Sequence, residues 1–129
     1  MVNETEALLV RQLVWDLSRE NAAVAVEGKR DAAALTGLGF EGALMQFHRY
    51  GGFAKFADAA VRHPRIILLF DYDRKGCYMT FRLARLLQRR TVVDLTYRRR
   101  LSKITGGRVR FVEELLRYRK ADLYAGVPT

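Results

Sequence analysis

The stretch that most constrains the fold is IILLFDYDRKG, residues 66–76, in which five continuous apolar residues run directly into two aspartates and a glycine. A short apolar run without alternating polar positions is typical of a strand that is buried on both faces, as in a parallel sheet covered by helices. Three further runs of this kind are AAVAV at 22–26, ALMQF at 43–47 and TVVDLT at 91–96. The sequence therefore predicts an α/β, Rossmann-like domain with a mainly parallel sheet of four strands, or of five if Val109–Phe111 forms a short one.

Amphipathic helices are predicted between and around these strands. Residues 53–61 place apolar side chains at i, i+3, i+4, i+7 and i+8, and residues 79–87 nearly repeat this spacing with arginines on the opposite face. A leucine-rich helix is expected within 1–19, and a short basic connection and a final helix and tail, 111–129, are expected after the last strand. A chain of 129 residues has the length of one domain, so we expect a single domain over 1–129.

The positive charge lies almost entirely in the second half of the chain. Residues 1–64 hold 7 basic and 8 acidic side chains, whereas residues 65–129 hold 16 and 6, which gives the whole chain a formal charge of +9. Such a basic half attracts polyanions such as nucleic acid, although it also suits a purely solubilising surface. No apolar run is long enough to span a membrane, and the N-terminal segment carries acids where a secretory signal has bases, so we expect a cytoplasmic protein with no membrane partner.

Acidic residues follow the first and third predicted strands. In an open parallel sheet the ligand site lies beyond the carboxyl ends of the strands, which here are followed by EGKRD at 27–31 and DYDRKG at 71–76. Asp31 is placed to cap or begin the next helix. Asp71 and Asp73 lie on the same side of the chain, and two such charges about 5 Å apart repel by about 3 kcal/mol at an effective dielectric constant of about 20. The compensating charge is either Mg²⁺ or an ion-pair network made by Lys29, Arg30, Arg74 and Lys75.

The two acidic loops resemble the motifs of a known family. VAVEGKRD at 24–31 and LLFDYDRKG at 68–76 are similar to the glutamate motif and the DxD motif of the Toprim domain, which is shared by topoisomerases, bacterial-type primases, OLD-type nucleases and the ribonuclease that matures 5S ribosomal RNA. The resemblance covers a Toprim-like core over about 20–120. The EGKxD form is most similar to the maturation ribonuclease and to small stand-alone Toprim proteins of archaeal type.

The resemblance implies roles for individual residues. Glu27 would be the general acid/base at the scissile phosphodiester, and it would hold Mg²⁺, or Mn²⁺ as a substitute, together with Asp71 and Asp73. Gly28 would let the backbone approach closely, and Gly76 would turn the chain into the helix after the DxD motif. Lys75 stands where the topoisomerases have a further acid, which implies one metal ligand fewer and favours a single Mg²⁺ or no catalysis.

Basic residues near and beyond these loops are expected to contact phosphates. They are Lys29, Arg30, Arg74, Arg82, Arg98, Arg99, Arg100 and Lys103. Tyr97 and Tyr118 are expected to stack on bases, whereas the alternative for residues 98–103 is a solvated helix face. His48 is left outside the catalytic set. The function expected is Mg²⁺-dependent endonucleolytic processing of structured RNA, with a non-catalytic nucleic-acid-binding module of an RNA-processing or ribosome-associated assembly as the alternative.

Overall fold

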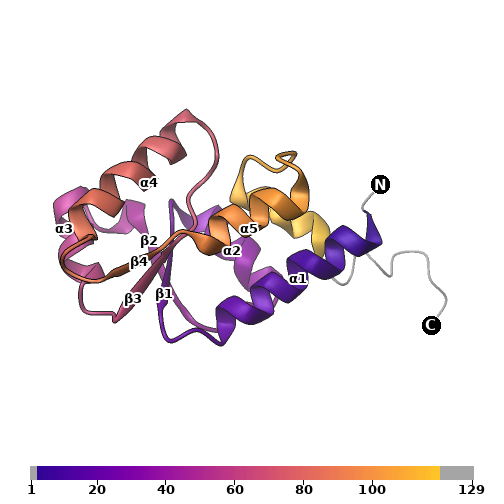
Figure 1. Cartoon of the computed structure of the whole chain (residues 1–129), viewed down its shortest axis with the longest axis horizontal. Helices are drawn as coiled ribbons and strands as arrows, with labels where there is room; N and C mark the ends of the chain where they lie inside the picture. The colour runs from indigo at the N-terminus through magenta and orange to yellow at the C-terminus, as the bar shows by residue number, and fades with distance from the viewer. Residues whose placement is uncertain (1–2, 120–129) are drawn as a thin grey trace.

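The computed structural model describes residues 3–119 as a four-stranded sheet with helices on both faces (Figure 1). The elements in chain order are α1 (Glu4–Ser18), β1 (Ala23–Val26), α2 (Lys29–Gly37), β2 (Ala43–Gln46), η1 (Phe47–Arg49), α3 (Phe53–Ala60), β3 (Arg65–Leu68), α4 (Arg74–Leu87), β4 (Val92–Asp94), α5 (Thr96–Thr105) and η2 (Val112–Tyr118), where η marks a 3-10 helix. Each of the four predicted apolar runs overlaps one of the strands, which confirms the α/β fold class.

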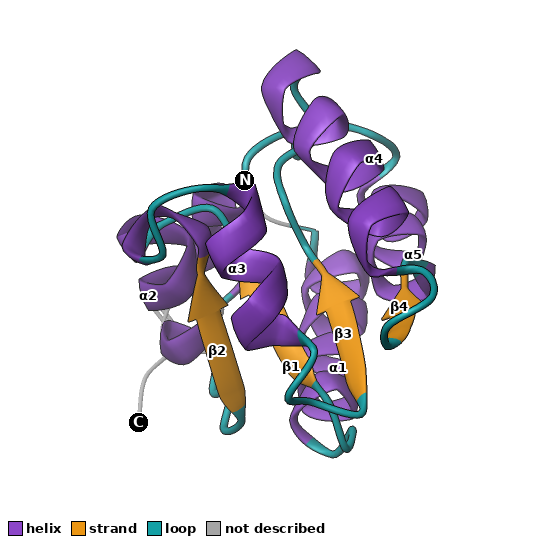
Figure 2. Ribbon diagram, turned by 90° about the vertical axis from the view of Figure 1, so that its left-hand side faces the viewer, coloured by secondary structure: helices purple, strands orange, loops and turns teal. Residues whose placement is uncertain are grey.

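The four strands are parallel and lie in the order β2-β1-β3-β4 (Figure 2). In this register Ala25 of β1 pairs with Met45 of β2 and with Leu68 of β3. The fifth strand at Val109–Phe111 is not formed in the part of the chain that the structure describes. One backbone hydrogen bond, from the Tyr72 N–H to the Arg110 carbonyl at 2.7 Å, joins that segment to the loop after β3, and a single bond does not make a ladder.

The sheet separates two hydrophobic clusters. Val24 and Val26 of β1 pack with residues of α1, α2, α5 and η2 on one face. Ala23 and Ala25 pack with residues of α3 and α4 on the other face. Successive strand side chains point to opposite faces, so a strand between two helix layers needs apolar residues at every position. This requirement explains the continuous apolar runs in the sequence.

Two helices differ from the sequence expectation. Helix α4 begins at Arg74, before its apolar spacing starts at Met79, because Asp73 caps it by accepting the Gly76 N–H at 2.8 Å. The basic connection expected after the last strand is wrong, since this segment is the helix α5. Tyr97 and Leu101 are buried on one face of α5 at i, i+4 spacing, so the basic residues occupy the remaining faces.

The two ends of the chain agree only in part with the expected elements. α1 lies within the predicted 1–19 segment and is capped by Asn3, whose side chain accepts the Glu6 N–H at 2.9 Å. The final helix expected in 111–129 is the 3-10 helix η2, and residues 120–129 lie outside the described residues. No helix within residues 3–119 combines the length and the apolar character needed to cross a bilayer.

Candidate active site at the carboxyl ends of the strands

The two acidic loops meet at the point where the strand order changes direction. From β1 the chain passes to α2 on one face of the sheet, and from the neighbouring β3 it passes to α4 on the other face (Figures 1 and 2). A crevice between two such diverging connections is the usual ligand site of an open α/β sheet. Glu27 and Asp71 lie at this point and interact electrostatically. The structure thus brings the predicted acids together.

Glu27 is a buried carboxyl group with poor compensation. Its side chain is buried, its Oε1 atom has no hydrogen-bond partner among the described residues, and its Oε2 atom lies 4.0 Å from Nζ of Lys75. Burial, followed by the charge of Asp71, raises the pKa of Glu27 from an ordinary 4.5 to about 7, against the opposing effect of Lys75. A carboxyl group with this pKa is able both to donate and to accept a proton near neutral pH.

The nearby aspartates hold the backbone around the site. Asp71 is buried and its Oδ1 accepts the Val112 N–H at 2.6 Å, while Asp31 accepts the Gly28 N–H at 3.1 Å. Burial raises the pKa of Asp71 to about 6, although the bond from Val112 lowers it, and burial also raises the pKa of Asp31. Asp73 is occupied as the cap of α4. Each aspartate therefore has a structural role besides any chemical one.

A side chain would collide with the backbone at Gly76 and would be crowded at Gly28. A Cβ atom at Gly76 would lie 2.0 Å from the carbonyl oxygen of Asp71, a backbone atom that cannot move aside without displacing the DxD loop. A Cβ atom at Gly28 would lie 3.1 Å from Nδ1 of His48, whose backbone N–H donates to the Glu27 carbonyl at 3.0 Å. Gly76 thus permits the turn into α4, and Gly28 permits the approach of the loop after β2.

A pocket of about 500 Å³ opens beside Glu27. The residues that line it are Glu27, Gly28, Lys29, Arg30, Asp31, His48 and Glu113. Two of these lay outside the predicted set of site residues. His48 follows β2, whose carboxyl end lies at the same edge of the sheet, so the parallel arrangement itself points to it. Glu113 comes from η2, and nothing in its local sequence indicates this position.

The cations expected in an ion-pair network are only partly engaged. Among residues 3–119, Lys75 is the one cation of the four within 4.0 Å of a carboxylate of the acidic loops. Lys29, Arg30 and Arg74 are exposed. Within the same range no three His, Cys, Asp or Glu side chains are grouped so that they could hold a metal ion by themselves. Any metal here would draw other ligands from water or substrate.

Two of the arginines expected on phosphates have partners within the fold. Arg98 donates to the carbonyl oxygens of Phe70 at 3.2 Å and of Asp71 at 2.7 Å, and its guanidinium lies 4.4 Å from the centre of the Tyr72 ring. Arg100 forms an ion pair with Asp16 of α1 at 2.8 Å. Arg98 thereby fixes the strand end that carries the aspartates.

The remaining residues that were expected to contact nucleic acid differ in their exposure to solvent. Arg82, Arg99 and Lys103 are exposed, as a phosphate contact requires. Tyr97 and Tyr118 are only 7% and 2% exposed, so the expectation that they stack on bases is wrong. Both rings are core residues instead.

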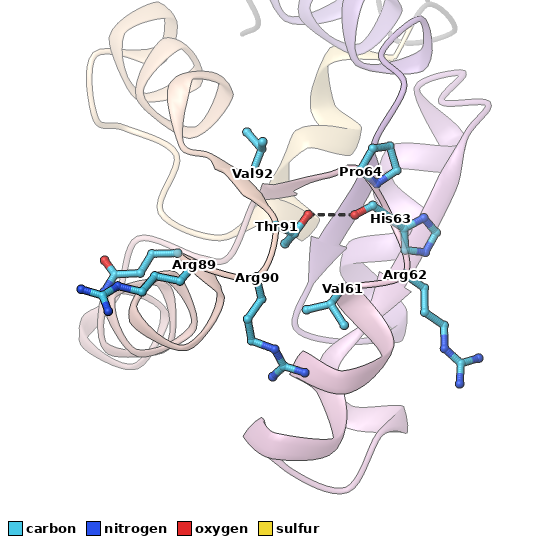
Figure 3. A pocket seen from close by; sticks show the side chains of 9 residues that line it. Val61, Arg62, His63, Pro64, Arg89, Arg90, Thr91 and Val92 are labelled. Carbon is cyan, nitrogen blue, oxygen red and sulfur yellow. Dashed lines mark hydrogen bonds between the residues drawn. The ribbon is translucent and has the colours of Figure 1, made fainter.

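A second hollow of about 590 Å³ lies at the opposite, amino end of β3 and β4 (Figure 3). Arg62, Arg89 and Arg90 border it, but they directly follow the ends of α3 and α4, where cations offset the negative end of a helix dipole. Arg90 also pairs with Asp58 at 3.0 Å, and in Figure 3 the Arg62 and Arg89 side chains extend in different directions. These arginines do not converge on one point, so the Glu27 pocket remains the candidate site.

Comparison with known proteins identifies close relatives. A UPF0292 protein of Thermococcus sibiricus is 34% identical over 107 residues, which cover 82% of this chain and 84% of the relative. A UPF0292 protein of Thermococcus gammatolerans is 33% identical over 105 residues, 81% of this chain and 78% of the relative. A solved structure of a protein from Aquifex aeolicus matches with a TM-score of 0.66 and 25% identity, covering 83% of this chain and 94% of that one. No protein-family model matches the chain.

Proposed function

The chain belongs to the UPF0292 family, and we propose that it is a Toprim-type protein that performs Mg²⁺-dependent phosphodiester chemistry on nucleic acid, namely the endonucleolytic processing of structured RNA. The observation that supports this proposal best is Glu27. It is a buried carboxyl group with an unpartnered oxygen, at the switch point of the sheet, on a chain of net charge +9. A cytoplasmic location is part of the proposal.

The residues present fit a magnesium ion. The unpartnered Oε1 of Glu27 and the mutual repulsion of the acids both call for a nearby cation. Glu27, Asp71 and Asp73, which among the described residues are not grouped closely enough to hold the ion by themselves, would contribute ligands to it together with water and phosphate oxygens, in keeping with the preference of Mg²⁺ for few protein carboxylates. Bound there, Mg²⁺ would stabilise the negative charge that develops on the reacting phosphate.

The side chains of this protein supply the other parts of the reaction. With a pKa raised to about 7, Glu27 exchanges a proton with the attacking or the leaving oxygen near neutral pH. The exposed Lys29, Arg30 and Arg74 lie in the first turns of α2 and α4, directly after the loops that carry the acids, where they bind the neighbouring phosphates of the nucleic acid. Arg98 positions the aspartates by holding the carbonyl groups of the strand end.

The test is cleavage of labelled structured RNA in the presence of Mg²⁺ or Mn²⁺. Glu27→Gln and Asp71→Asn should each abolish cleavage without loss of RNA binding. The matched control is Asp58→Asn, which removes an exposed carboxylate on α3 from an ion pair outside the site. The mechanism is wrong if the wild-type protein does not cleave, or if both site variants keep wild-type activity.

The second candidate is a non-catalytic nucleic-acid-binding module within an RNA-processing or ribosome-associated assembly. The contact of 4.0 Å between Lys75 and Glu27 favours it, as do the backbone N–H groups that the aspartates already accept. Affinity purification from cell extract separates the two. A stable complex with RNA-processing proteins, together with no turnover by the isolated chain, would support the module.

A further inference from the structure

The outer face of α4 carries large apolar side chains that the core does not use. Tyr78 and Phe81 are 54% and 63% exposed, and Leu86 is 40% exposed. Together with Arg82 and Arg85 they line a shallow hollow of about 400 Å³, which is here called the α4 surface. The core contacts of the helix are made by its other face, through residues such as Met79 and Leu83, so packing within this chain does not account for the exposed rings.

The arginines of the α4 surface lie against aromatic rings. The guanidinium of Arg82 is 4.3 Å from the centre of the Phe53 ring and donates to the Tyr78 hydroxyl at 3.0 Å. The guanidinium of Arg85 is 5.8 Å from the centre of the Phe81 ring. Neither arginine forms an ion pair with any residue in 3–119. α4 contains four cationic residues and no acidic one, so the surface is complementary to a polyanion that also offers flat apolar groups.

A row of ring contacts joins the α4 surface to the candidate active site. The Tyr78 ring lies 6.3 Å from Phe53, and Phe53 lies 4.9 Å from Phe47, measured between ring centres. Phe47 directly precedes His48, which lines the Glu27 pocket. α4 itself starts at the DxD loop, and at a rise of 1.5 Å per residue Phe81 is about 12 Å along the helix from Asp73. A ligand on this surface that extends about 12 Å along the helix therefore reaches the acidic loop.

We propose that the α4 surface binds single-stranded nucleic acid, with bases stacked on Phe81 and Tyr78 and backbone phosphates on Arg82 and Arg85. Only unpaired bases are free to stack on protein rings, because in a double helix their faces are covered by neighbouring bases. The inference rests on the proposed function in taking nucleic acid as the substrate. It adds that the segment beside the cleaved bond is single-stranded, and binding at this surface requires neither Glu27 nor a metal.

The test is fluorescence anisotropy with a labelled single-stranded RNA of about 12 nucleotides and with the same sequence as a duplex, both in EDTA. Phe81→Ala should weaken single-strand binding at least about fivefold, since base stacking on an aromatic residue has this strength, and Arg85→Gln should weaken it as well. Both side chains are exposed, so thermal unfolding should be unchanged. Duplex binding should change less than single-strand binding.

The matched control is Trp15→Ala. Trp15 is also an exposed ring, 59% accessible, with the guanidinium of Arg19 at 5.6 Å, but it lies on α1, which also carries acidic residues. This substitution should change the affinity less than about twofold. Unchanged binding by both Phe81→Ala and Arg85→Gln would overturn the inference, and so would a wild-type dimer that Phe81→Ala converts to a monomer, because the surface would then belong to a second copy. Because the binding assay contains EDTA, its result does not depend on cleavage. A wild-type protein that is inactive in the cleavage assay would refute the proposed function and would leave the binding result unaffected.

Discussion

Replacing Glu27 by Gln should stabilise the protein at alkaline pH. Burial and the charge of Asp71 raise the pKa of Glu27 from 4.5 to about 7. A shift of this size corresponds to about 3 kcal/mol of unfavourable free energy for the ionised group in the folded state, at about 1.4 kcal/mol per pKa unit. Gln keeps the shape of the side chain and removes its charge, although it leaves a buried amide without a full set of partners. We expect a net gain of about 1–3 kcal/mol in the free energy of unfolding at about pH 8.

The raised pKa of Glu27 also determines how the stability of the protein changes with pH. Because the folded protein binds the Glu27 proton more tightly than the unfolded chain does, the wild-type protein should lose stability as the pH rises from about 4.5 to about 7 and level off above that range. Glu27→Gln lacks this loss, so the two proteins should have similar stability at about pH 4 and differ most at about pH 8. Urea denaturation followed by circular dichroism in EDTA measures both curves. The control is Glu41→Gln, which removes an exposed carboxylate.

Magnesium provides a second arm of the same experiment. An ion that binds the folded wild-type protein stabilises it by mass action, and it should do so less for the variant that lacks the Glu27 charge. The reasoning would be refuted if Glu27→Gln were less stable than the wild-type protein at about pH 8, or if the difference were the same at both pH values. The first result would mean that the surroundings stabilise the Glu27 carboxylate, and the second that folding does not raise the pKa of Glu27.

Three further predictions concern the contacts around the site. Gly76→Ala should lower the free energy of unfolding by about 3 kcal/mol or more, and the melting temperature with it, because the methyl group would lie 2.0 Å from the Asp71 carbonyl oxygen. Cys77→Ala, at an exposed position, should change both quantities little. Arg98→Ala should lower the free energy of unfolding, measured by urea denaturation, by about 1–3 kcal/mol, because two hydrogen bonds to carbonyl groups are lost. Arg99→Ala, at an exposed position, should lower RNA affinity alone. Equal effects of the two substitutions on stability would contradict these roles. If about six cations contact single-stranded RNA, the logarithm of the binding constant should fall against the logarithm of salt concentration with a slope of about −4, and a slope near zero would exclude a phosphate-dominated complex.

The parts of the site that the sequence predicts are those fixed by local pattern. A buried parallel strand is recognisable from its apolar run, and the residue after it must lie at the carboxyl edge of the sheet. This is why Glu27 and Asp71, from two loops far apart in the chain, could be placed in one site. Gly76 could be predicted for the same reason, because a chain that turns from a strand into a helix within a few residues requires close backbone contact.

The parts that the sequence does not predict depend on long-range packing. Arg98 and Arg99 are adjacent and chemically identical, yet only Arg98 faces the strand end, because α5 packs with Tyr97 and Leu101 toward the core. Val112 reaches Asp71 across 41 residues through its backbone N–H, which any residue except proline provides. No residue type marks such a contact. Both the hydrogen bonds from Arg98 to the strand end and the approach of η2 to Asp71 can therefore be recognised only in the folded chain.

The distribution of hydrogen-bond partners among the acids sets Glu27 apart from the three aspartates. Asp31, Asp71 and Asp73 each accept a backbone N–H that shapes a loop or starts a helix, so folding alone accounts for them. Glu27 has no such partner among the described residues, and its one cationic neighbour, Lys75, is 4.0 Å away. A buried charge without a partner lowers stability, and an uncharged side chain at this position would serve the fold better. A phosphodiester-cleaving site requires a group that exchanges protons, and under the proposed function Glu27, with its raised pKa, is the residue that would meet this need.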